Sequence, residues 1–123
     1  MAAPNLINAS TINGKTTGAN LTTTSATSIL NNARGSGKCL KINTLNVSNY
    51  GAAAANITVA WYSAASLGGT AYAISGAVTV PSYSTLTVID KTTQYYLEEN
   101  QSLGATAGAA NTLIVTCSYE DIS

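Results

Sequence analysis

The chain has 123 residues, with five Lys or Arg, five Asp or Glu and no histidine. This length suits one domain. The lack of histidine removes the commonest metal ligand and the usual general base at neutral pH. Zero net charge removes the attraction that nucleic acids and anionic membranes require. We therefore expect a protein that is not an enzyme, holds no metal or cofactor, and binds neither nucleic acid nor membrane.

Alternating apolar residues predict β-strands. In residues 56–62, Ile57, Val59 and Trp61 share one face, which predicts that they point into a core. Threonine and valine, which suit pleated surfaces, are frequent, and glycine-rich turns separate the segments. The predicted strands cover residues 5–12, 26–31, 38–49, 56–63, 70–75, 77–80, 84–90, 94–97, 102–107 and 112–121. Many short strands with frequent turns predict an all-β fold, an antiparallel β-sandwich of the Ig-like or jelly-roll-like kind.

The N-terminal region differs from the rest of this single domain. Residues 1–25 contain few aliphatic side chains after Ile12 and are rich in threonine. We interpret them as an extended arm or edge strand followed by a loop, able to lie on a neighbouring subunit. Residues 26–123 then form the β-sandwich domain.

One predicted strand contains a change of parity. Leu40 and Ile42 occupy even positions, whereas Leu45 and Val47 occupy odd ones. A regular strand would send the two pairs to opposite faces. We therefore predict a β-bulge or bend near residues 43–44.

The two cysteines, Cys39 and Cys117, are too few for a disulfide scaffold. Cys39 is predicted on the face opposite Leu40, and Cys117 on the apolar face of its strand. A bridge between them is one interpretation, and two separately packed thiols is the favoured one. The first residues show no secretory signal, so we expect synthesis in the cytosol.

Catalytic patterns are absent from the sequence. Glu98 and Glu99 are adjacent and, in a strand, would point to opposite faces, so they cannot flank one bond. Residues 34–39 resemble a phosphate-binding loop but lack its first glycine and its Ser/Thr. They predict a basic hairpin turn instead.

The aromatic residues have three interpretations: protein contact, packing at the core and its rim, or carbohydrate binding. Tyrosine is favoured at interfaces because it combines a large apolar area with a polar tip. We expect Tyr62 to point outward. Tyr95 and Tyr96 are adjacent, which predicts one toward the interior and one, Tyr96, toward solvent.

The charges are segregated along the chain. Arg34, Lys38 and Lys41 lie within eight positions, and all five acidic residues follow position 89. In a homo-oligomer, a basic edge could meet an acidic edge of the next copy. The alternative is a surface network of ion pairs within one chain, which contributes little to stability.

Three segments resemble small virion proteins of tailed bacteriophages of the marine and cyanophage type. They are residues 2–8 (AAPNLIN), 80–91 (VPSYSTLTVIDK) and 96–123, which begins YLEENQSL and ends VTCSYEDIS. The likeness is strongest over residues 80–123. Such proteins commonly have Gly where this chain has Asn100, and Asn also tolerates positive φ, so we expect the turn to survive.

The resemblance implies a non-enzymatic structural protein of the virion, made in the host cytoplasm. It implies a decoration or cement protein on the capsid, contacting the major capsid protein. The alternatives are a neck or tail adaptor, fibre or tail decoration protein contacting neck or tail proteins, and a carbohydrate-binding host-attachment module. A homo-oligomer is expected, with a trimer favoured. The residues that we nominate for protein contacts are Asn5, Leu6, Ile7, Arg34, Lys38, Lys41, Tyr62 and Tyr96.

Overall fold

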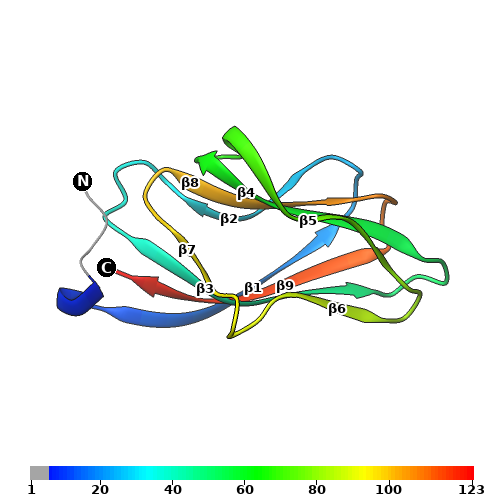
Figure 1. Cartoon of the computed structure of the whole chain (residues 1–123), viewed down its shortest axis with the longest axis horizontal. Helices are drawn as coiled ribbons and strands as arrows, with labels where there is room; N and C mark the ends of the chain where they lie inside the picture. Colours follow the sequence, from blue (N-terminus) through cyan, green and yellow to red (C-terminus); the bar gives the residue numbers. More distant parts are fainter. Residues whose placement is uncertain (1–5) are drawn as a thin grey trace.

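The computed structural model describes the backbone of residues 6–123 and the side chains from residue 7 onward. A short 3-10 helix, η1 (Leu6–Asn8), precedes the strands (Figure 1). The strands are β1 (Ile12–Leu21), β2 (Thr27–Asn32), β3 (Cys39–Asn49), β4 (Ala55–Ala64), β5 (Gly68–Val80), β6 (Thr85–Ile89), β7 (Tyr95–Leu97), β8 (Gln101–Ala107) and β9 (Leu113–Ile122).

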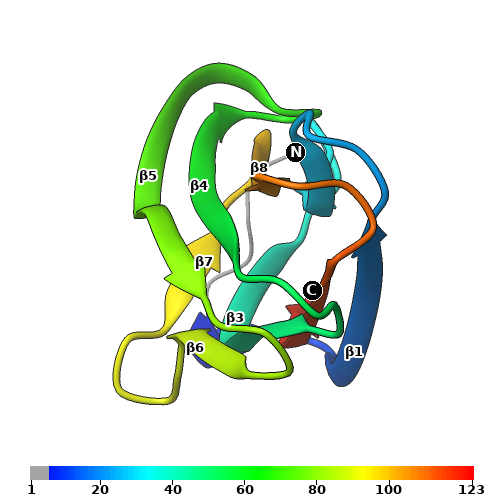
Figure 2. The ribbon, with the colours of Figure 1, turned by 90° about the vertical axis from the view of Figure 1, so that its right-hand side faces the viewer.

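The strands form two antiparallel sheets that pack face to face (Figures 1 and 2). The five-stranded sheet has the order β1-β9-β3-β6, and β7 also pairs with β3. The four-stranded sheet has the order β2-β8-β4-β5. The predicted all-β antiparallel sandwich is therefore confirmed.

The first predicted strand, 5–12, is wrong. Leu6–Asn8 form η1, and the strand begins at Ile12 and runs to Leu21. No aliphatic residue larger than alanine lies between Ile12 and Leu21, so β1 has no alternation to detect. Its place is fixed by backbone pairing with β9, from Ile12 opposite Ile122 to Leu21 opposite Leu113. Farther along the chain, the predicted segments 70–75 and 77–80 merge into one strand, β5.

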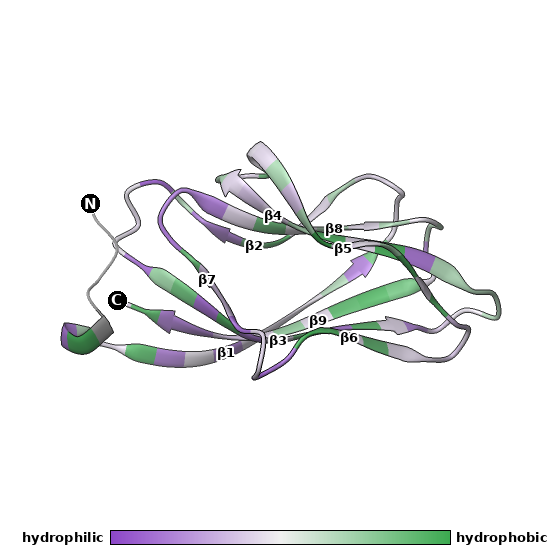
Figure 3. Cartoon of the chain, viewed as in Figure 1, coloured by the Kyte–Doolittle hydropathy of each residue, from purple (hydrophilic) through white to green (hydrophobic). Residues whose placement is uncertain are grey.

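The core lies between the two sheets, where apolar side chains of both inner faces meet. Figure 3 shows hydrophobic positions along strands of both sheets. The largest fully buried side chains are Leu21, Ile42, Leu45, Ile57, Ile89, Leu97, Leu103, Leu113, Val47, Val59, Val80 and Val115. Ile57 and Val59 point inward as predicted, while Trp61 is only half-buried at the rim of the core.

The predicted bulge is present in β3. The register against β9 shifts between Ile42 and Thr44, which leaves Asn43 as the extra residue. Because of this shift, Leu40, Ile42, Leu45 and Val47 are all buried despite their opposite parities.

Deleting Asn43 should preserve the fold, because the four apolar residues would then share one parity in a regular strand. We expect a loss of about 1 kcal/mol in unfolding free energy, from the hydrogen bonds that Asn43 makes to Glu120 and Gln94. Deleting Thr116, in a regular part of β9, is the matched control and should prevent folding, because it turns Cys117 outward. Urea unfolding distinguishes the two. Equal damage by both deletions would argue against the bulge.

Two buried asparagines join the sheets at opposite ends. Asn32, the last residue of β2, donates from Nδ2 to the carbonyl oxygens of Lys38 (2.9 Å) and Leu97 (3.0 Å). Asn49, the last residue of β3, donates from Nδ2 to the carbonyl oxygens of Ala53 (2.9 Å) and Val80 (3.0 Å). Each amide thus connects the end of a strand in one sheet to a strand of the other.

Candidate functional site

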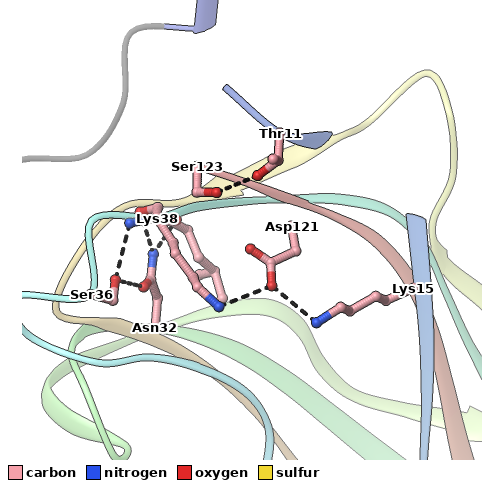
Figure 4. Close-up of polar contacts among 8 residues, drawn as sticks. Thr11, Lys15, Asn32, Ser36, Lys38, Asp121 and Ser123 are labelled. Atoms are coloured by element: carbon pink, nitrogen blue, oxygen red, sulfur yellow. Dashed lines mark hydrogen bonds and ion pairs between the residues drawn. The ribbon is translucent and has the colours of Figure 1, made fainter. Parts of the chain in front are cut away.

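Most of the predicted basic contact residues are paired within the chain. Lys38 Nζ lies 3.2 Å from Asp121 Oδ2, and Lys15 Nζ lies 3.1 Å from the same oxygen (Figure 4). Lys41 Nζ lies 3.6 Å from Glu120 Oε2. β9, which carries both carboxylates, lies between β1 and β3; Lys15 comes from β1, Lys41 from β3, and Lys38 directly precedes β3. The charge segregation along the sequence therefore becomes an ion-pair network within one chain.

The basic hairpin turn predicted at residues 34–39 is wrong. Residues 33–38 connect β2, in the four-stranded sheet, to β3, in the five-stranded sheet. The composition of this segment correctly indicated a turn. It could not show that the strands before and after the turn belong to different sheets. Lys15 was missed as a partner because β1 itself was not predicted at that position.

Asp121 is a buried carboxylate with an altered acidity. Burial favours its neutral form, but hydrogen bonds from Lys15 and Lys38 and the charges of both lysines outweigh burial, so its pKa is lowered. A lowered pKa in the folded state stabilises the fold above the unfolded-state pKa. That contribution is lost as the pH falls through the folded-state pKa.

We expect Asp121→Asn to reduce the unfolding free energy at neutral pH by about 1 kcal/mol, since both lysines are nearly half exposed and screened by solvent. The difference from the unmodified chain should shrink as the pH falls below about 4, where the carboxylate is protonated in the unfolded chain. Urea unfolding across this pH range measures it. Glu98→Gln removes an exposed carboxylate and is the control. A deficit of the same size in acid would show that the ion pairs are not its cause.

One end of the sandwich carries η1, the start of β1 and the C-terminus (Figure 1). The backbone amides of Ser10 and Thr11 donate to the Ser123 carbonyl at 2.7 and 2.9 Å, which places the described N-terminal segment beside the C-terminus. Ile7 in η1 is 91% exposed, and Ile12 is also exposed. Arg34 is exposed and forms no ion pair within residues 7–123, and it lies in the connection that leads into Cys39, which pairs with Ile122 at this end. We call Ile7, Ile12 and Arg34 the terminal face.

Two further nominated residues lie at the edge of what the structure describes. Asn5 lies outside the described residues. Leu6 is the first residue of η1, and its side chain lies outside the described set.

Tyr62 is half-buried and lies against its own chain. A Cβ atom built at Gly104 would lie 3.0 Å from Tyr62 Cε1 and 2.7 Å from Leu67 Cδ2. The glycine in β8 therefore makes room for these two side chains to lie over the sheet. Tyr62 therefore contributes to packing. Less of its surface is available to a partner than we expected for a side chain that points outward.

Tyr96 forms part of an aromatic groove. The groove has a volume of about 370 Å³ and is lined by Trp61 of β4, by Tyr72, Ala73 and Ile74 of β5, and by Tyr95 and Tyr96 of β7. It lies where β5, an edge of one sheet, faces β7 of the other (Figure 2). Tyr95 and Tyr96 are 38% and 45% exposed, so the expectation that one of them points into the interior is wrong. Of this three-residue strand, only Leu97 is buried.

The groove is rigid at its base and polar at its rim. The rings of Trp61 and Tyr72 have centroids 5.2 Å apart and are tilted by 32°. Trp61 Nε1 donates to Gln101 Oε1 at 3.3 Å, which fixes the indole. Tyr72 is 54% exposed. The phenol hydroxyls of Tyr72, Tyr95 and Tyr96 have no hydrogen-bond partner among the described residues. No charged side chain lines the groove.

The same region contains the turn that depends on Asn100. Asn100 has a φ of 61°, so the positive-φ turn expected there is present. Its Oδ1 also accepts a hydrogen bond from the Ala65 amide at 3.2 Å.

The two cysteines are free and buried, at separate positions of the five-stranded sheet. Cys39 pairs with Ile122, and Cys117 pairs with Leu45. Burial raises the pKa of Cys117 to about 12. Burial, and then the charge of Glu98, raises the pKa of Cys39. Both thiols are therefore protonated and poor nucleophiles at neutral pH.

In the described part of the chain, no three or more Cys, Asp or Glu side chains come together as a metal site would require. None of the helices in this part is long and apolar enough to cross a membrane.

The fold and groove define an all-β sandwich with an exposed aromatic groove on one side. No protein-family model matches the chain, and no curated protein sequence matches it.

Proposed function

We propose that the chain is a non-enzymatic structural protein of a phage particle that decorates the capsid and reinforces its lattice. The proposed location in a phage particle rests on the resemblance of residues 2–8 and 80–123 to small virion proteins. The observation that carries the contact role is the terminal face, where Ile7 exposes almost its entire side chain. An exposed large aliphatic group gains free energy when a partner removes it from water.

The charge distribution supports the same surface. Lys15, Lys38 and Lys41 have carboxylate partners within the chain, whereas Arg34 has none in the described part. Arginine is among the residue types that are enriched at protein interfaces and dominate their binding energy. The partner surface on the capsid protein would offer an apolar pocket with a carboxylate at its rim.

We also propose that the protein acts as a homo-oligomer, with three copies per unit. Support comes from β1, which pairs with β9 on one side only and is mostly exposed along its length. Its one charged residue, Lys15, is engaged by Asp121. Edge strands without free charges or prolines are prone to pair with another chain.

Reconstitution tests this role. Purified protein is added to phage heads that lack it, and bound copies are counted by quantitative mass spectrometry against the major capsid protein. We expect many copies per head, and about tenfold weaker binding for Ile7→Asp, which places a charge in an apolar contact. Tyr83→Asp, a change at an exposed residue in another loop, should bind normally. Unchanged binding of Ile7→Asp would refute the terminal face, and absence from heads would refute the decoration role.

A further inference from the structure

We propose that the aromatic groove is a binding site for a neutral saccharide. This goes beyond the structural role, because it concerns a different surface of the molecule. In the five-stranded sheet, β1 forms one edge and β7 lies beyond β3, with β9 and β3 between them. Contacts made along β1 would therefore not cover the groove.

The shape and composition of the groove suit a sugar ring. Trp61, Tyr72, Tyr95 and Tyr96 come from three strands and both sheets, and they converge on one hollow of about 370 Å³. This volume falls at the lower end of the range for small-molecule sites. The C–H faces of pyranose rings are apolar and pack on aromatic faces, which carry partial negative charge.

The phenol hydroxyls of the groove can form hydrogen bonds with the hydroxyl groups of a saccharide. Saccharide hydroxyls both donate and accept hydrogen bonds, and so do phenol hydroxyls. Those of Tyr72, Tyr95 and Tyr96 are unused within the described chain and lie at the groove. Because the lining contains no charged side chain, nothing there would compensate an anionic sugar for lost water. The site should therefore prefer neutral saccharides.

A proline-rich peptide is the competing occupant, because such peptides also dock in aromatic grooves. A polyproline helix offers only carbonyl acceptors, so it needs strong donors from the protein. The indole N–H of Trp61, which is a donor only, is already bonded to Gln101 Oε1. The phenol hydroxyls can donate to either occupant, but only a saccharide also uses them as acceptors, which favours the saccharide.

The pre-formed geometry should limit the entropy lost on binding. Gln101 Oε1 accepts hydrogen bonds from both Trp61 Nε1 and the backbone amide of Glu98, which ties the indole to the chain before β8. The indole also contacts the Tyr72 ring. A pre-organised aromatic base loses little freedom when a ligand stacks on it.

The test uses the single tryptophan of the chain, which lies in the groove and reports on its occupancy by fluorescence. The purified full chain is titrated with neutral oligosaccharides of glucose, galactose, mannose and N-acetylglucosamine, with oligogalacturonate as the acidic comparison, and with polyproline. We expect saturable binding of at least one neutral oligosaccharide, and weaker binding of oligogalacturonate than of the neutral galactose oligomer.

Variants then locate the site. Tyr72→Ala and Tyr96→Ala should each weaken saccharide binding by about tenfold, the effect of losing one stacked ring. Tyr72→Phe keeps the ring and should have a smaller effect. Tyr83→Ala, at an exposed tyrosine outside the groove, should bind normally, and thermal unfolding should show that every variant is folded. Equal binding by Tyr72→Ala would overturn the site.

Two other outcomes would also overturn the proposal. One is no binding of any neutral oligosaccharide, and the other is binding of polyproline alone. Because these titrations use the isolated chain without phage heads, their failure would leave the decoration role intact. Failure of the chain to bind heads would in turn leave the saccharide site intact.

Discussion

Replacing Asn49 with alanine is expected to reduce the unfolding free energy by about 3 kcal/mol. The side chain is buried, donates to the carbonyl oxygens of Ala53 and Val80, and accepts from the Gly51 amide at 2.9 Å. Its removal leaves these three backbone groups without their partner. Each unsatisfied buried polar group costs on the order of 1–3 kcal/mol, and water entering the space would recover part of it.

Equilibrium unfolding in urea measures this cost. The matched control is Asn13→Ala, at an exposed asparagine of β1 whose side chain makes no hydrogen bond within the described residues, and it should change stability little. Asn49→Asp keeps the acceptor for Gly51 but faces the two carbonyl oxygens with a carboxylate, so it should be at least as damaging as alanine. A loss below about 1 kcal/mol for Asn49→Ala would show that the amide does not hold the sheets together.

Leu103→Ala should also cost about 3 kcal/mol, as typical for a fully buried leucine. Leu103 lies in the middle of the four-stranded sheet, opposite Leu30 of β2 on one side and Trp61 of β4 on the other. Its side chain is fully buried, so its loss leaves a cavity between the sheets. The fluorescence of the neighbouring Trp61 should shift toward that of a more hydrated indole.

Two controls test whether the loss of stability comes from the cavity or whether the fold is sensitive to any substitution of an apolar residue. Leu103→Met nearly conserves volume and should cost less than about 1.5 kcal/mol. Val78→Ala, at a partly exposed valine of β5, should cost well under 1 kcal/mol. If Leu103→Ala were no worse than Val78→Ala, the core would not lie where the buried residues place it.

Periodicity and parity predicted the parts of this fold that depend on apolar side chains. The sandwich itself and the bulge at Asn43 both follow from where aliphatic residues must point. β1 could not be predicted in this way, because its stretch of glycine, threonine and asparagine is held by backbone pairing with β9. The register of β1 depends on the position of β9 and is not encoded in an apolar pattern of β1 itself.

The candidate sites depend on three-dimensional neighbours that spacing along the chain does not show. Nothing in the sequence distinguishes Asn32 and Asn49 from the other asparagines. They link the two sheets only because the fold places a backbone carbonyl of the opposite sheet within hydrogen-bond distance of each side chain. Tyr96 was nominated as a contact residue, whereas Tyr95 was expected to point toward the interior. Their meeting with Trp61 and Tyr72 depends on how β5 faces β7, which no local pattern specifies.

The two proposed surfaces lie on different parts of the sandwich and follow different physics. The terminal face offers aliphatic side chains and an arginine without an ion-pair partner in residues 7–123, which suits a protein partner. The groove offers aromatic faces and phenol hydroxyls that no described residue engages, which suits a neutral sugar. A capsid decoration protein with this arrangement would hold the lattice through the terminal face and present a sugar site at the groove.

An image reconstruction of an intact phage particle that contains this chain tests the central proposal most directly. The account predicts sandwich-shaped density in many copies on the head, with η1 and the start of β1 against the capsid and the groove between β5 and β7 facing outward. Density confined to a few copies at the neck or tail, or a groove turned into the lattice, would contradict it.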